Sequence, residues 1–294
     1  MKLACYYRDG IVRPGIMEGT GIIDIQDSAH ATGISMSDRD MLSDIGAIIA
    51  GGTKSIGLFS RMRGGFPTVD TGVTRLAPPI PNPPKIIAAG MNYRDHAREL
   101  KSEAPRTPII FCKSSTSVIG PGGPIRWPGE ITQQVDIEVE LAVVMAGHPR
   151  EMTRASAMEA VFGYTILNDV SARDIQFTDK QWFRAKSIDT FCPMGPWIAT
   201  RDEISDPQNL KLTSSVNGKT WQSSSTSEMI FSVADLIIFT ARAMRLNPGD
   251  IIATGTPAGV GYSHQPQEFL KKGDIVSMEI EGLGVLTNPV DGPF

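Results

Sequence analysis

The sequence predicts a mainly β protein of the α+β class, with short strands rolled into a closed or sandwiched structure. Its 29 glycines and 21 prolines mark many turns between short apolar runs, and this punctuation favours strands. Segments with helical spacing are fewer than strand-like runs. Short strands separated by turns bury their apolar faces by packing into sandwiches or closing into barrels, which is why we expect such a fold.

The bulk composition excludes several classes of protein. The chain has 294 residues, of which 41% are hydrophobic and 20% charged, as in ordinary globular proteins with a buried core. A net charge of -4 without a basic run argues against nucleic acid as a partner. No apolar stretch approaches the ~18 residues that a membrane helix needs. Three widely spaced cysteines and an early charged N-terminus predict a cytoplasmic protein with reduced thiols.

A proline-rich segment divides the chain. Residues 76–84 contain five prolines, which exclude a helix and a central strand, so we predict an extended linker there. Residues 1–75 predict a small α/β domain, with a strand in Gly19–Ile25 and a helix from Ser37 to Gly52. Residues 85–294 then form a second, larger domain.

The larger domain consists mostly of strand-like runs. Apolar and β-branched segments between turn residues predict strands at 85–90, 108–113, 136–145, 162–169, 196–200, 210–218, 250–256, 275–282 and 284–290. Two segments have helical spacing. They run from Thr153 to Gly163 and, after a capping serine, from Ser232 to Met244.

Three acids alternate with apolar residues in the segment Val135–Met145. Period two places Asp136, Glu138 and Glu140 on one strand face, about 6.5–7 Å apart, where like charges repel. A solvated acidic edge is one interpretation. However, Asp169 ends the next strand-like run, and acids from two strand ends can converge. With no Cys/His cluster to compete, a divalent cation bound by hard oxygen ligands would resolve the repulsion.

Three other stretches carry groups suited to catalysis. Lys186 precedes a Pro/Gly-rich turn, although a solvated surface lysine has the same pattern. Thr256 lies at the end of a strand-like run, among small hydroxyl residues and glycines. These residues could bind a carboxylate, or they could simply form a tight turn. His96 and Glu99 are spaced i, i+3, so a short helix would bring them together as a general base and its orienting carboxylate. A surface helix of mixed charge is the alternative for that pair.

Taken together, these stretches resemble the fumarylacetoacetate hydrolase superfamily, in particular its branch of bacterial acylpyruvases, oxaloacetate decarboxylases and 2,4-diketo-3-deoxy sugar acid hydrolases. The motifs span residues 85–290 in the family's order. They are GMNYRDHARE, PIIFCKSSTSVIGPGGPI, VDIEVELAVV, GYTILNDVSARDIQ, RAKSIDTFCPMGP, SEMIFSV and IIATGTPAGVG. The resemblance implies a rolled, mainly β sandwich or barrel as the catalytic domain, preceded by a small N-terminal domain and assembled as a homodimer.

The resemblance also implies roles for single residues. The family's ligands for Mg2+ or Mn2+ fall on Glu138, Glu140 and Asp169, whereas Asp136 has no ligand role. Substrate-facing positions fall on Arg173, Lys186 and Thr256. His96 and Glu99 match a catalytic dyad on a mobile lid.

The implied reaction acts on a small 2-oxo acid. We expect hydrolysis of the C3–C4 bond of a 2,4-dioxo acid, an acylpyruvate or a diketo-deoxy sugar acid, which releases pyruvate through a metal-stabilised enolate. Oxaloacetate decarboxylation uses the same enolate and is the alternative, and lyase, dehydratase and isomerase chemistry stay open. A non-catalytic protein that binds a metal and a 2-oxo acid is the alternative of another class. The presence of His96, Glu99 and Lys186 argues against it.

Overall fold

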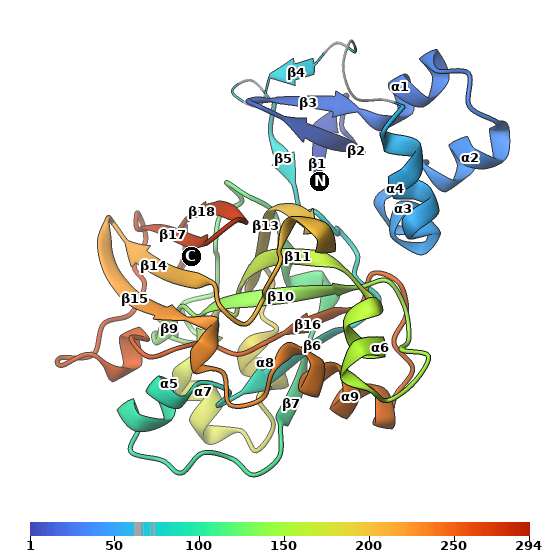
Figure 1. Cartoon of the computed structure of the whole chain (residues 1–294). Helices are drawn as coiled ribbons and strands as arrows, with labels where there is room; N and C mark the ends of the chain where they lie inside the picture. Colours follow the sequence, from blue (N-terminus) through green and yellow to red (C-terminus); the bar gives the residue numbers. More distant parts are fainter. Residues whose placement is uncertain (62–65, 67, 71, 73) are drawn as a thin grey trace.

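A 12-stranded sheet runs through most of the chain in the computed structural model, which describes residues 1–61, 66, 68–70, 72 and 74–294 (Figure 1). Its path is β4 (Thr68–Asp70), β3 (Gly21–Asp24), β2 (Ile11–Glu18), β1 (Lys2–Arg8), β13 (Cys192–Thr200), β11 (Val161–Asn168), β10 (Val139–Met145), β16 (Ile251–Ala253), β6 (Ile86–Gly90) and β7 (Ile109–Lys113). β5 (Leu76–Ala77) pairs with β1, and β8 (Val118–Ile119) with β13. Pairing is antiparallel except between β16 and β6 and between β13 and β8. The predicted mainly β, α+β class is confirmed, whereas closure into a roll stays a prediction.

Two smaller sheets are formed by strands between residues 135 and 289. The four-stranded one has the order β15 (Lys219–Ser225), β14 (Lys211–Val216), β17 (Ile275–Ile280) and β18 (Gly284–Pro289), and the two-stranded one joins β9 (Val135–Asp136) to β12 (Ser171–Ala172). Every residue of β10 is buried. Leu141 and Val143 belong to the core shared with the four-stranded sheet, while Ala142 and Val144 belong to a second core shared with the N-terminal elements. Apart from Glu140, strand β10 is therefore apolar on both faces, and each buried valine or leucine contributes ~1.5–3 kcal/mol.

Short helices connect and cover the strands. They are α1 (Ile25–Ala31), α2 (Met36–Met41), α3 (Ile45–Gly51), α4 (Thr53–Phe59), α5 (Arg94–Glu99), α6 (Arg154–Glu159), α7 (Arg173–Thr178), α8 (Phe183–Lys186) and α9 (Val233–Ala243). The expected cap of α9 is confirmed, since the Ser232 hydroxyl accepts from the Asp235 N–H in a capping box. Within the described ranges, no helix is long and apolar enough to cross a membrane.

Two helix predictions were wrong in their extent. The predicted helix from Ser37 to Gly52 is two helices, because the Asp44 side chain accepts from the N–H of Ala47 and starts α3 anew. Ser35, not Ser37, caps α2. The predicted helix from Thr153 ends at Glu159, and Gly163 lies in β11 instead of stopping a helix. A Cβ at Gly163 would approach the Ala199 carbonyl oxygen to 2.3 Å, so close strand packing explains this glycine.

The N-terminal elements extend the main sheet. Strand β1 pairs antiparallel with β13, with Leu3 opposite Ile198. Figure 1 shows helices α1 to α4 gathered beside the N-terminal strands. In the proline-rich segment, Leu76 and Ala77 form β5 against β1. The predicted strand Gly19–Ile25 is confirmed as β3, which ends one residue earlier at Asp24. The division into domains at residues 76–84 stays a prediction.

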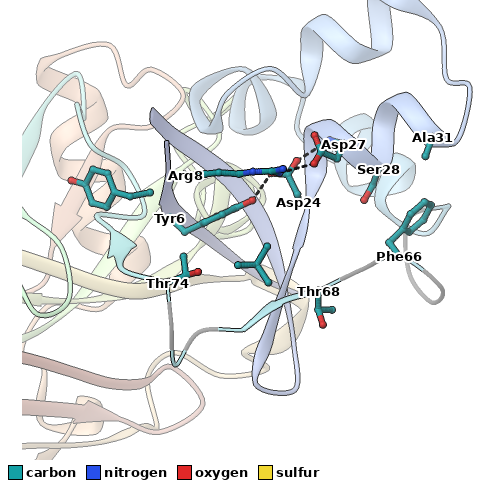
Figure 2. Close-up of a pocket in the computed structure, with 11 residues that line it drawn as sticks. Tyr6, Arg8, Asp24, Asp27, Ser28, Ala31, Phe66, Thr68 and Thr74 are labelled. Carbon is teal, nitrogen blue, oxygen red and sulfur yellow. Dashed lines mark hydrogen bonds and ion pairs between the residues drawn. The ribbon is translucent and has the colours of Figure 1, made fainter. Parts of the chain in front are cut away.

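A cavity of about 400 Å3 lies among these N-terminal elements (Figure 2). Its charged groups are paired with each other. Tyr6 donates to Asp24, and Arg8 lies 2.6 Å from Asp27. Because these groups satisfy one another, this cavity is not the candidate functional site.

Candidate active site

The acidic segment is not one continuous strand, which corrects the prediction for residues 136–145. Strand β9 ends at Asp136 and β10 begins at Val139, with Ile137 and Glu138 between them. Side chains take over the hydrogen bonds that the ladder loses: the N–H of Glu138 donates to Oδ1 of Asn168 at 3.1 Å, and that of Val139 to Oε1 of Gln222 at 3.0 Å. The break turns Asp136 away from the other two acids.

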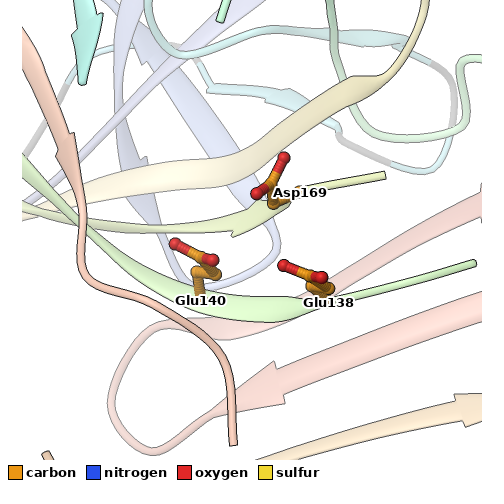
Figure 3. Close-up of side chains that lie close together, drawn as sticks. All are labelled: Glu138, Glu140 and Asp169. Atoms are coloured by element: carbon orange, nitrogen blue, oxygen red, sulfur yellow. The ribbon is translucent and has the colours of Figure 1, made fainter. Parts of the chain in front are cut away.

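Glu138, Glu140 and Asp169 converge, as the family resemblance implied. One carboxylate oxygen from each lies within 4.8 Å of the others, and all three residues are buried (Figure 3). The pairing of Val139 with Asn168 sets β10 beside β11, and the N–H of Asp169 donates to the Glu138 carbonyl at 2.9 Å. The backbone thus fixes the spacing of the three acids.

Asp136 has a structural role in this arrangement. Its carboxylate accepts from the N–H groups of Gly261 and Tyr262 at 2.8 and 3.0 Å, and from Nε of Arg173 at 2.9 Å. Nη1 of Arg173 then donates to Oε1 of Glu138 at 2.7 Å. Arg173 therefore ties the loop that carries Gly261 to the acid cluster.

Two buried lysines contact the cluster. Nζ of Lys186 donates to Oε2 of Glu138 at 2.9 Å and to Oδ2 of Asp169 at 2.7 Å, so Lys186 is no solvated surface lysine. Nζ of Lys113 donates to Oδ1 of Asp169 at 2.6 Å and to the Lys186 carbonyl. Although burial lowers the pKa of Lys186, the charges of Asp169 and Glu138 outweigh this effect and raise it. Lys113 was not predicted from the sequence, and its one signal was its place at the end of the predicted strand 108–113.

The charges of the cluster suit a divalent cation. When Glu140 is ionised, the four buried carboxylates of Asp136 and the three converging acids exceed the three cationic side chains of Lys113, Arg173 and Lys186 by one negative charge. Glu140 accepts from the Gly255 N–H at 2.9 Å, and burial together with the charges of Asp169 and Glu138 raises its pKa well above the ordinary value. A cation bound by these hard oxygen ligands would favour the ionised form of Glu140. The donor set therefore fits Mg2+ or Mn2+.

The predicted His–Glu pair is formed on α5. Nδ1 of His96 lies 3.0 Å from Oε2 of Glu99, and Oε1 of Glu99 accepts from the Gly259 N–H at 2.9 Å. Burial raises the pKa of Glu99, but the bonds from His96 and Gly259 lower it more, so the carboxylate form is favoured. Polar contacts hold the helix against the segment 224–229 of the same chain. Arg94 donates to the Met229 carbonyl at 2.6 Å, and Asp95 accepts from Ser224. Mobility of this segment stays a prediction.

A cavity of about 130 Å3 joins these groups. Five of the residues singled out in the sequence line it, namely His96, Glu138, Arg173, Lys186 and Thr256. The Thr256 hydroxyl donates to the Val139 carbonyl at 3.1 Å and accepts from Nε2 of Gln222 at 2.7 Å. Aromatic rings of Phe111, Phe177, Trp182 and Tyr262 complete the walls. The cavity is small and combines few polar groups with apolar walls, as expected of a site for a small acid.

The fold and the site define an α+β protein with a buried acidic centre that fits a divalent cation, next to a histidine that a carboxylate orients. Comparison with known proteins identifies the family. The model described as "Fumarylacetoacetate (FAA) hydrolase C-terminal" matches residues 85–291, and the chain belongs to the fumarylacetoacetate hydrolase family. The resemblance seen in the motifs is thereby confirmed.

Individual relatives are similar over most of the chain. Oxaloacetate tautomerase fahd2, mitochondrial, from Xenopus laevis is 48% identical over 217 residues, 73% of this chain and 68% of the relative. Oxaloacetate tautomerase YisK from Bacillus subtilis is 47% identical over 219 residues, 74% of this chain and 73% of the relative.

Solved structures of the family share the fold over the whole chain. The fumarylacetoacetate hydrolase of Exiguobacterium antarcticum has a TM-score of 0.84 and 36% identity, and covers 100% of both chains. The maleylpyruvate hydrolase of Sphingobium sp. SYK-6, in complex with manganese(II) and pyruvate, has a TM-score of 0.80 and 29% identity, and covers 99% of both chains. The protein is therefore an enzyme of this family.

Proposed function

We propose that this protein interconverts the keto and enol tautomers of oxaloacetate with the help of a divalent cation. The observation that carries the proposal is the cluster of three buried acids, whose member Glu138 lines one small cavity together with Lys186 and His96. Relatives 47–48% identical to the chain bear the name oxaloacetate tautomerase, which favours this reaction over the hydrolysis expected from the motifs.

Three acids would hold the cation. Glu138, Glu140 and Asp169 are proposed as the ligands of Mg2+ or Mn2+, and the manganese in a structure with 29% identity supports this choice. Bound there, the cation would supply Lewis-acid polarisation of the 2-oxo group of the substrate.

Cationic and hydroxyl groups would bind the 2-oxo acid. Lys186 and Arg173 line the cavity with positive charge, and Thr256 presents a hydroxyl beside them. The ammonium group of Lys186, buried and held in place by two carboxylates, can stabilise negative charge that develops on the 2-oxo oxygen. Because its surroundings are already oriented, little reorganisation is needed during the reaction.

His96 is the proposed base. Tautomerisation takes a proton from C3 of the substrate and places one on the 2-oxo oxygen, so no water is consumed. Glu99 occupies Nδ1 of His96, which leaves Nε2 as the ring nitrogen that can accept the C3 proton. The Glu99 carboxylate orients the ring and stabilises its protonated form.

Hydrolysis of the C3–C4 bond of a 2,4-dioxo acid is the second candidate. The His96–Glu99 pair could equally take a proton from water, and a maleylpyruvate hydrolase is among the similar structures. In that reaction the same cavity binds a larger acid and releases pyruvate.

Three parallel assays separate the candidates. The first follows the ultraviolet absorbance of the oxaloacetate enol, with and without Mg2+ or Mn2+. The second measures pyruvate released from oxaloacetate, which reports decarboxylation, and the third measures pyruvate released from acylpyruvates, which reports hydrolysis. We expect the cation to accelerate enol loss without matching pyruvate release. Faster hydrolysis than tautomerisation would favour the second candidate, and binding of oxalate without any turnover would identify a non-catalytic protein.

We also propose that the enzyme works in the cytoplasm as a homodimer, with residues 85–294 as its catalytic domain. The matched family region supports the last point, since it begins at residue 85. Light scattering coupled to size exclusion tests the dimer.

A further inference from the structure

The loop that follows β16 links two parts of the site. Its residue Gly259 donates its N–H to Oε1 of Glu99 at 2.9 Å, and its carbonyl oxygen lies 3.2 Å from Nε2 of His264. A carbonyl oxygen only accepts hydrogen bonds, so Nε2 of His264 carries the hydrogen. His264 thus holds the residue that in turn holds Glu99.

The backbone at Gly259 leaves little freedom. Its φ of +100° lies in the region that favours glycine. A Cβ there would approach the Trp221 carbonyl oxygen to 2.2 Å. The Trp221 ring meets the His264 ring edge to face, with centroids 5.0 Å apart. The same tryptophan therefore packs on both Gly259 and His264. The position of the Gly259 N–H depends on this packing.

Other contacts fix the far end of the loop. The N–H groups of Gly261 and Tyr262 donate to Asp136, and the N–H of His264 donates to the Gly261 carbonyl at 3.2 Å. Between these anchors and Glu99, the side chain of His264 is the group that contacts the Gly259 carbonyl. Loss of this contact would release Gly259 while the anchors at Asp136 stay in place.

We propose that His264 is a positioning residue for the His96–Glu99 pair and acts through Gly259. The inference rests on the proposed function, in which His96 is the base. Glu99 accepts one hydrogen bond from His96 and one from Gly259, so a displaced Gly259 would turn the carboxylate and, with it, the imidazole ring. A misplacement of about 1 Å at a reacting group can cost about 10²-fold in rate.

Charged groups also lie near the other ring nitrogen of His264. Nδ1 of His264 faces Oε2 of Glu268 at 3.6 Å, and Glu268 is paired with Lys219 at 2.6 Å. The Nε2–H bond to Gly259 exists both in the cation and in the neutral tautomer that carries the hydrogen on Nε2. An uncharged N–H donor of similar length can therefore replace the histidine.

Substitutions in the full chain, measured with Mg2+ present, test the inference. His264→Leu removes the donor, His264→Asn keeps one that is too short to reach, and His264→Gln restores one of similar length. We expect Leu and Asn to lower kcat for oxaloacetate by about 10–100-fold. The KM for oxaloacetate and the calorimetric Kd values of Mg2+ and oxalate should stay within about 2-fold, and Gln should recover most of the kcat. His30→Leu, in the N-terminal region, is the matched control.

Either of two results for kcat would overturn the inference: an unchanged kcat in both His264→Leu and His264→Asn, or an equal loss in His264→Gln. A loss of Mg2+ and oxalate affinity as large as the loss of kcat would also contradict it, because that pattern indicates general disruption of the site. Gly259→Ala is an independent check, since its Cβ must displace the loop and should lower kcat in the same way.

A His96→Gln variant separates this inference from the proposed function. If His96→Gln lowers turnover and the His264 variants do not, only the positioning role is wrong. If His96→Gln retains full turnover, His96 is not the base, and both proposals fail together.

Discussion

The ammonium nitrogen of Lys113 lies 2.6 Å from Oδ1 of Asp169, and both side chains are completely buried. Lys186 holds the other oxygen of the same carboxylate at 2.7 Å. Asp169, a proposed metal ligand, is thus fixed between two lysines that lie in different parts of the chain.

Removal of the Lys113 charge should destabilise the protein strongly. Lys113→Met keeps much of the side chain's length but leaves Asp169 with one cationic partner fewer, and breaking a buried ion pair costs about 3–5 kcal/mol. Urea unfolding should show a decrease of that size in the free energy of unfolding. Lys180→Met, on the exposed surface, should change it by less than about 0.5 kcal/mol. Equal, small effects would mean that Lys186 alone compensates Asp169.

Substitution of a proposed metal ligand should weaken Mn2+ binding more than substitution of the neighbouring Asp136. Glu138→Gln, Glu140→Gln and Asp169→Asn each remove a converging carboxylate, so calorimetric titration with Mn2+ should show affinity losses beyond 100-fold, on the order of a lost ligand. Asp136→Asn acts through Arg173 and should cost about 10–100-fold or less.

Removal of the divalent cation should also abolish activity. A chelator should abolish turnover, and added Mg2+ or Mn2+ should restore it. Full turnover in a verified metal-free sample, or equal losses of Mn2+ affinity from all four substitutions, would contradict the ligand assignment.

Loss of the base should affect turnover more than ligand binding. His96→Ala removes the ring nitrogen proposed to accept the substrate proton and should lower kcat by about 10²–10⁴-fold. Oxalate should still bind, because Arg173, Lys186 and Thr256 line the cavity independently of α5. Stopped-flow measurement of enol decay, beside oxalate titration, separates the two effects. If oxalate affinity falls as far as kcat, His96 is a binding residue.

Acid should weaken the contribution of Glu99 to stability. Its pKa is lowered in the folded protein, because the bonds from His96 and Gly259 outweigh the opposite effect of burial. Its contribution is therefore fully present above the unfolded value of about 4.3 and is lost as the pH falls through the lower folded value. The difference in unfolding free energy between wild type and Glu99→Gln should shrink below a pH of about 4. Glu103→Gln, on the exposed surface, should show no such trend.

Local sequence patterns determined the strand-rich class and most of the strands. Runs such as residues 162–169 and 275–282 are apolar and β-branched between turn residues, so the local signal agrees with the final structure. The i, i+3 spacing of His96 and Glu99 likewise predicted their contact, since a single helical turn decides it. The motifs by themselves were specific enough to indicate the family.

Tertiary structure decided what depends on distant partners. The break between β9 and β10 arises because Asn168 and Gln222, far along the chain, take the backbone hydrogen bonds of Glu138 and Val139. The division of one expected helix at Asp44 is instead a local effect, because its side chain accepts from the N–H of Ala47 three residues further on. Period-two alternation alone contains no information on such competition.

The balance of charge was also invisible in the sequence. From the residues alone, acids of two strand-like runs were expected to converge, and the family resemblance indicated which ones. Only the folded chain decided that Lys113 and Lys186 approach Asp169 from opposite sides, and that Arg173 joins Asp136 to Glu138. The physical reason is that burying a charge is unfavourable until a partner is beside it, and the partners here come from segments up to 56 residues apart.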